Sequence, residues 1–185
     1  AGTSDRTITQ ARAAIRESLK LDRNFPTEKL FEALGRNGRL ARLDERGIEE
    51  VLQLHYKSSK CFFALSLLYE NLDWGGTQYH VDHIIPHSHA DRRRLMSANI
   101  SEHRIKAIMA SVDRIGNLQL LPASENLEKS DMPFDTWMQT RDGHYLKRHY
   151  IPDVVDDRHV SKLPEFVAAR EKLIWQNLKR LQLPG

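Results

Sequence analysis

The chain has 185 residues, a formal net charge of +3 at pH 7, 40% hydrophobic residues and one cysteine, Cys61. One cysteine excludes a disulfide framework, and no apolar run reaches the length that spans a bilayer. The net charge is too small to identify a nucleic-acid partner. From the single cysteine and the absence of a long apolar run or a signal peptide, we expect a soluble, cytoplasmic protein with no membrane partner.

The first 74 residues have the apolar spacing of helices, without a strand pattern. We expect a helix over residues 8–19, one opening at Thr27, one capped by Asp44, and one from about Ser59 that stops at Gly75. Gly75 and Gly76, which follow the last of these helices, would let the chain turn into the next segment.

Residues 79–86, Tyr-His-Val-Asp-His-Ile-Ile-Pro, are expected to form a short strand that ends at Pro86. Asp82 is a hard oxygen ligand, and His83 is a base that titrates near neutral pH. Alternate side chains of a strand share a face, so His80 and Asp82 point the same way, and His80 is a candidate to orient a ligand or to contact a DNA phosphate. A metal-bound carboxylate beside a histidine base suits phosphodiester hydrolysis.

Residues 87–114 contain a basic run, Arg92, Arg93 and Arg94, and are expected to hold one helix around residues 102–111. Further basic residues are Arg104, Lys106 and Arg114, with a second group at Lys147, Arg148 and His149. Such a cluster would lower the cost of holding a polyanion, although an arginine triplet can also be a solvated surface.

A second short strand is predicted from Gly116 to Pro122, followed by a short helix with Asn126 and Lys129 one turn apart. Asn126 offers a second oxygen ligand, and Lys129 could neutralise a phosphate oxygen. Oxygen ligands without a nearby thiolate favour one Mg²⁺ or Mn²⁺ ion over structural zinc. Each residue also has an ordinary reading: Gly-Asn is common in turns, and Asn126 and Lys129 can be solvated.

Two helices are expected to complete the chain. Pro133 opens the first, and the second is a long amphipathic helix over residues 163–181.

The residues around Asp82, His83, Asn117 and Asn126 resemble the HNH, or ββα-metal, endonuclease motif. The resemblance implies that Asp82 and Asn126 bind one divalent ion and that His83 is the general base. It also implies that Asn117 braces the loop that carries Asp82 and His83. The segment from Asn117 to Lys129 is similar to the corresponding part of the HNH domain in RNA-guided CRISPR nucleases, but the insertion before it is much longer here.

A second resemblance is to the C-terminal nuclease domain of GmrSD-type restriction enzymes and SspE-type phage-defence proteins. It rests on that insertion, on the segment from Arg114 to Leu118 and on the helical tail. The resemblance implies a nicking DNA endonuclease that is the effector of an antiphage restriction system acting on modified phage DNA. It further implies an N-terminal ParB-like nucleotide-hydrolysing domain. Because the chain begins Ala-Gly-Thr-Ser, we expect it to be a piece of such a longer protein.

The expected fold class is α+β: a mainly helical domain with a small ββα-metal finger and two or three short strands. We expect a helical part at residues 1–74, the nuclease core with its basic insertion at 75–150, and a helical tail at 151–185.

Three alternatives remain open from the sequence. The first is a non-catalytic DNA-binding or scaffold module that keeps the ββα fold. The second is an RNA-directed toxin. The third is a transition-metal site in the histidine-rich tract of His80, His83, His87 and His89. Structural zinc, however, is usually coordinated by four protein ligands.

Overall fold

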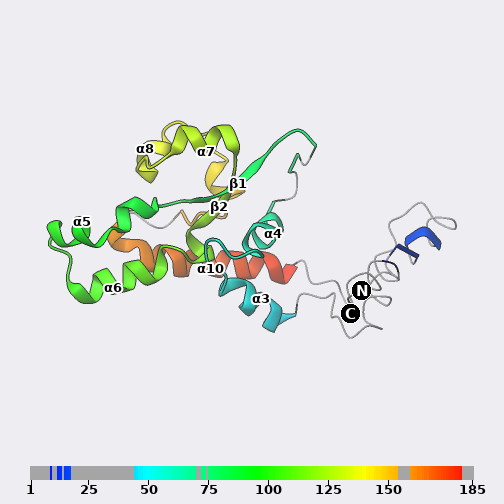
Figure 1. Cartoon of the computed structure of the whole chain (residues 1–185), viewed down its shortest axis with the longest axis horizontal. Coiled ribbons are helices and arrows are strands. Elements are labelled where there is room, and N and C mark those ends of the chain that lie inside the picture. Colours follow the sequence, from blue (N-terminus) through cyan, green and yellow to red (C-terminus); the bar gives the residue numbers. More distant parts are fainter. Residues whose placement is uncertain are drawn as a thin grey trace. The chain divides into compact units, whose positions relative to one another are not determined.

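A computed structural model describes residues 9, 12, 13, 15–17, 44–69, 72, 73, 75–153 and 159–180. Residues 45–181 form one compact unit. Its elements in chain order (Figure 1) are α3 (Glu45–Leu52), α4 (Cys61–Ser66), β1 (Tyr79–His83), η1 (His87–Ala90), α5 (Arg92–Ser97), α6 (Glu102–Ser111), η2 (Ile115–Asn117), β2 (Leu118–Pro122), α7 (Ala123–Lys129), α8 (Phe134–Met138), α9 (Tyr145–Arg148), η3 (Val160–Lys162) and α10 (Leu163–Arg180).

The fold is α+β, as expected, because a mainly helical unit contains one small sheet. In this sheet β1 pairs with β2 in antiparallel register, and Asp82 lies opposite Gln119 while His83 lies opposite Leu118. Helix α7 follows β2 directly and packs against both strands (Figure 1). The order strand, strand, helix is therefore present, with the insertion between the strands.

Most expected helices of the described part are present, with two differences. The insertion holds α5 as well as α6, because Asp91 caps α5 by accepting from the backbone N–H groups of Arg93 and Arg94. Helix α4 ends at Ser66, well before Gly75. Of the first expected helix, the described residues 9, 12, 13 and 15–17 are helical, whereas the helix expected at Thr27 lies outside the described residues. The three-part subdivision of the chain stays a prediction.

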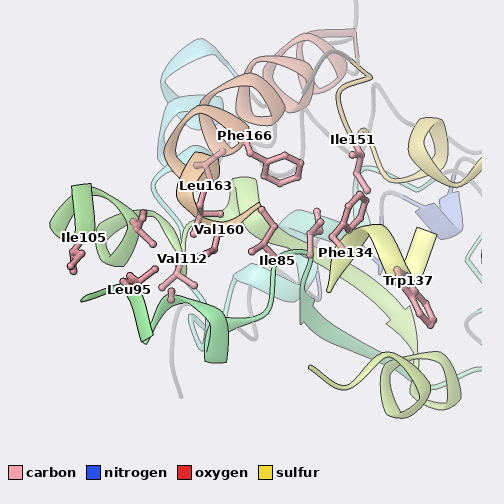
Figure 2. Packing of buried hydrophobic residues seen from close by; sticks show 14 of the residues in the cluster. Ile85, Leu95, Ile105, Val112, Phe134, Trp137, Ile151, Val160, Leu163 and Phe166 are labelled. Atoms are coloured by element: carbon pink, nitrogen blue, oxygen red, sulfur yellow. The ribbon is translucent and has the colours of Figure 1, made fainter. Parts of the chain in front are cut away.

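The core joins the insertion to the C-terminal helices. Figure 2 shows it running from Leu95 and Ile105, past Ile85, to Phe134 and Trp137. Among the described residues, no helix combines the length and apolar character that a membrane crossing requires.

Helix α10 holds the segment that leads into β2. A Cβ atom on Gly116 would lie 2.8 Å from both Cγ1 and the backbone oxygen of Val167, so only glycine permits this approach. Arg170, fully buried on α10, donates to the backbone oxygens of Ile115, Gly116 and Leu118. The start of β2 is thereby fixed by α10.

The second basic group of the sequence, Lys147, Arg148 and His149, is not a continuous surface cluster, because only Lys147 and Arg148 are exposed. His149 is buried, its Nδ1 lies 2.9 Å from the hydroxyl oxygen of Tyr69, and its ring stacks on Tyr145 at 4.2 Å. Burial lowers the pKa of His149 to about 3, with Arg170 as the next cause. His149 is therefore a neutral core residue, which a sequence pattern of three adjacent basic residues does not reveal.

This burial predicts a pH-dependent loss of stability. The unfolded chain takes up a proton on His149 below its ordinary pKa of 6.5, whereas the folded chain does so only near pH 3. The free energy of unfolding should therefore be highest above pH 6.5 and fall below it by at most about 1.4 kcal/mol per pH unit. Urea denaturation of the wild type and His149→Gln across this range isolates the effect, because the other titrating groups are common to both. Parallel stability curves for the two proteins would contradict it.

Candidate active site

Asp82 lies at the end of β1 and is 9% exposed. Its Oδ2 atom accepts a hydrogen bond from Gln119 Nε2 at 2.9 Å and pairs with Lys129 Nζ at 3.0 Å. Among the described residues both donors engage Oδ2, so Oδ1 remains for a further ligand. The carboxylate is held from the second strand and from α7 at once.

A buried chain of hydrogen bonds sets the orientation of Gln119. The indole N–H of Trp137 can only donate, and it donates to the hydroxyl oxygen of Tyr145 at 2.9 Å. The Tyr145 hydroxyl then donates to Gln119 Oε1 at 2.8 Å. The amide nitrogen of Gln119 must consequently face Asp82, and the Asp82 oxygen must accept. The chain of donors therefore directs the Gln119 amide nitrogen to Oδ2 of Asp82.

Lys129 is fully buried and joins the two central residues of the motif. Besides pairing with Asp82, its Nζ donates to the backbone oxygen of His83 at 2.6 Å. The sequence suggested that Lys129 neutralises a phosphate oxygen. In the structure its ammonium group is enclosed by protein contacts, so its geometry favours holding Asp82 over direct contact with a phosphate at the surface.

Asn126 and His80 lie together on the same side of β1 as Asp82. The amide nitrogen of Asn126 is 3.3 Å from His80 Nδ1, which leaves the amide oxygen for another ligand. Helix α7, which carries Asn126, is clamped to α8 by Arg141, which pairs with Glu125 and Glu128 on α7. The guanidinium also lies 3.9 Å from the ring centroid of Trp137, so Asn126 sits on an anchored helix.

The donor set fits a hard divalent ion better than zinc. Asp82 and Asn126 would offer an ion one carboxylate oxygen and one amide oxygen, the kind of ligand that Mg²⁺ and Mn²⁺ prefer when water and phosphate complete the shell, and their binding of an ion stays a prediction. Within the described part of the chain, no three His, Cys, Asp or Glu side chains converge as a metal-binding group. The histidine-rich tract thus does not form a closed zinc site among these residues.

His83 is paired with a residue that the sequence did not single out. Its Nε2 atom lies 2.8 Å from Oδ1 of Asp113, and its ring lies against Tyr56, with centroids 4.4 Å apart. Because an ionised carboxylate only accepts, Nε2 carries the proton and Nδ1 is the nitrogen that can take another. Burial lowers the pKa of His83, although Asp113 acts in the opposite direction. A neutral imidazole is the form that a general base needs.

Asn117 is fully buried and fixes the chain that follows His83. Its Oδ1 accepts from the N–H of Ile85 at 2.9 Å, and its Nδ2 donates to the backbone oxygens of Ile85 and Val112. Its own backbone oxygen accepts from the N–H of Ile84. These contacts hold Ile84 and Ile85, which follow His83 directly, and the part of Asn117 in catalysis stays a prediction.

Several arginines of the insertion already have acidic partners. Arg92 pairs with Glu102 through both carboxylate oxygens, and Arg104 pairs with Glu165. Arg93 is exposed, and the side chain of Arg94 lies 3.4 Å from the backbone oxygen of Ser88. The positive charge available to a polyanion is therefore smaller than the sequence suggests, and contact of Arg92, Arg93 and Arg94 with DNA stays a prediction.

The family model for the C-terminal domain of GmrSD restriction endonucleases matches residues 43–161, which include both strands, the insertion and α7. The chain belongs to this family. A search of curated proteins found no match. The membership makes this a nuclease domain of the restriction-endonuclease type, and the residues described in contact with Asp82 and His83 lie within the matched range.

Proposed function

We propose that the chain is a divalent-metal-dependent DNA endonuclease that uses its ββα unit as an HNH-type active site. The observation that carries this proposal is the pair of adjacent, differently held residues at the end of β1. Asp82 accepts from Gln119 and pairs with Lys129, and His83 is backed by Asp113 with one nitrogen left to accept a proton. A metal-binding carboxylate and a neutral base are the two groups that hydrolysis of a phosphodiester requires.

Asp82 and Asn126 would hold a single Mg²⁺ or Mn²⁺ ion. When bound, the ion supplies charge that polarises a phosphoryl oxygen and stabilises the departing 3′ oxygen. The chain's own step is proton transfer: Nδ1 of His83 takes a proton from water as the water oxygen attacks phosphorus and the bond to the 3′ oxygen breaks. Asp113 keeps the imidazole oriented and stabilises the positive charge that it gains. Asn117 keeps the base and Asp82 in register.

We further infer that the domain nicks DNA and is the effector of a larger antiphage protein. A single base and a single ion cut one strand for each encounter, which supports nicking. The family's place among restriction endonucleases supports the antiphage role. In that role an N-terminal nucleotide-hydrolysing domain would sense modified phage DNA, and the present chain would cleave it.

Supercoiled plasmid tests this function most directly. We expect nicked circles to appear first with Mg²⁺ or Mn²⁺ and no cleavage with EDTA. The matched control is Asp82→Asn, which keeps the size of the side chain but removes the charge that attracts the ion. Linear DNA from the outset would favour a preformed dimer, and equal cleavage by wild type and Asp82→Asn would favour the non-catalytic scaffold with a contaminating nuclease.

A further inference from the structure

We propose that Lys129 makes binding of the divalent ion depend on DNA, by neutralising Asp82 when no substrate is present. This inference rests on the proposed function, because it concerns the same metal site. The central observation is a buried ion pair: Lys129 is fully buried, Asp82 is 9% exposed, and their charged atoms are 3.0 Å apart.

The charges around this pair leave an incoming ion without compensation. Asp82 and Lys129 sum to zero, and Asn126 is neutral. The nearby acids of α7, Glu125 and Glu128, are engaged by Arg141. A divalent cation held by Asp82 and Asn126 would therefore meet no net charge from these two residues together with Lys129. Glu125, Glu128 and Arg141 sum to −1, but both carboxylates are turned toward the guanidinium. Holding an ion that its own ligands do not compensate in a partly buried site is costly.

A DNA phosphate removes that cost. It brings a negative charge and an oxygen ligand to the same place, so ion and DNA should each strengthen binding of the other. Binding linkage requires the two effects to be equal in size, and couplings of this kind are roughly 5- to 150-fold. The free domain would then hold the ion weakly and assemble its active site on the substrate.

Two substitutions separate the charge of Lys129 from its hydrogen bond. Lys129→Met and Gln119→Leu each remove one donor from Oδ2 of Asp82, but only the first removes a positive charge. If Lys129 acts through charge, Lys129→Met should bind Mn²⁺ more tightly than the wild type without DNA, by about tenfold or more. Gln119→Leu should bind Mn²⁺ no more tightly than the wild type. A purely structural role predicts weaker binding for both.

The measurement is isothermal titration calorimetry of Mn²⁺ into the DNA-free 185-residue chain, with thermal melting as a second readout. Lys129→Met should melt at a lower temperature than the wild type and recover more of its stability when Mn²⁺ is added, because the ion replaces the missing counter-charge. Lys129→Gln serves as the second variant if Lys129→Met does not fold. The proposal is overturned if the folded Lys129→Met and Lys129→Gln variants bind Mn²⁺ no more tightly than the wild type. It is also overturned if Gln119→Leu gains as much Mn²⁺ affinity as the Lys129 variants.

The DNA dependence is measured without altering Lys129. Mn²⁺ is titrated into His83→Ala, which keeps the DNA intact, with and without a short duplex. Tighter binding with the duplex is expected, and equal affinities overturn the inference even if no Lys129 variant folds. Plasmid cleavage that needs a metal, together with equal affinities, would reject this inference alone. Absence of Mn²⁺ binding in every condition, together with absence of cleavage, would reject the proposed function as well.

Discussion

His83→Ala is expected to lower the rate of plasmid cleavage by about 10²- to 10⁴-fold, which is the usual cost of losing a general base. Binding of Mn²⁺ and of DNA should be retained. The proposed ligands come from Asp82 and Asn126, and Lys129 contacts the backbone oxygen of His83, which alanine preserves. The measurement is the single-turnover cleavage rate at saturating metal, together with calorimetric titration of Mn²⁺ into both proteins.

Two further variants separate the base from its neighbours. Asp113→Asn keeps a polar group beside Nε2 but removes the charge that stabilises the protonated imidazole, so it should lower the rate less than His83→Ala and leave Mn²⁺ affinity unchanged. His87→Ala removes an exposed ring 5.6 Å from that of His83 and should cleave at nearly the wild-type rate. If His83→Ala cleaves DNA while His87→Ala or His80→Ala does not, the general base has been assigned to the wrong histidine.

Local sequence patterns predicted the elements around the site well. The segment before Pro86 contains β1, but the strand ends at His83 and not at Pro86, because the N–H of Ile85 bonds to the Asn117 side chain. The apolar run after Asn117 is β2. The antiparallel pairing of these strands is a finding of the structure, whereas Asn117 was expected from the motif to brace the adjacent loop. These features depend on residues that are close in sequence or on strongly patterned segments, which is where sequence reasoning is most informative.

The partners of the proposed catalytic side chains could not be predicted in the same way. Asp113 is 30 residues from His83, and nothing in the pattern around Asp113 distinguishes it from other acidic residues of the insertion. Gln119 faces Asp82 only because of the strand register, which a one-residue slip would change completely. Tyr145 reaches Gln119 from α9, a four-residue helix that no periodicity indicates.

Lys129 shows a different limit of sequence reasoning. A lysine near the end of a short helix is usually solvated, because burying an ammonium group is costly without a partner. Here the partners are the Asp82 carboxylate and the His83 backbone oxygen, and both come from β1. Only the packing of α7 against β1 makes the buried position favourable. The sequence could place Lys129 beside the site, but not inside the protein.

Asn117→Ala is expected to give the largest loss of stability among substitutions at the motif positions. The change removes three side-chain hydrogen bonds from a fully buried position and leaves backbone groups of Ile85 and Val112 without these partners. At about 1 kcal/mol for each bond, the free energy of unfolding should fall by about 3 kcal/mol. For a chain of this size the melting temperature should fall by roughly 10 °C. Differential scanning calorimetry of the metal-free protein measures this directly.

Asn126→Ala is the matched control, because it removes the same side chain from a partly exposed position on α7. It should melt within a few degrees of the wild type but need more Mn²⁺ for half-maximal cleavage, since it loses a proposed ligand. Asn117→Ala should show the opposite pattern: a clear loss of stability, and a lower cleavage rate with little change in the Mn²⁺ requirement. Equal melting temperatures for the two variants would contradict the bracing role of Asn117. A raised Mn²⁺ requirement in Asn117→Ala alone would place the metal nearer to Asn117 than to Asn126.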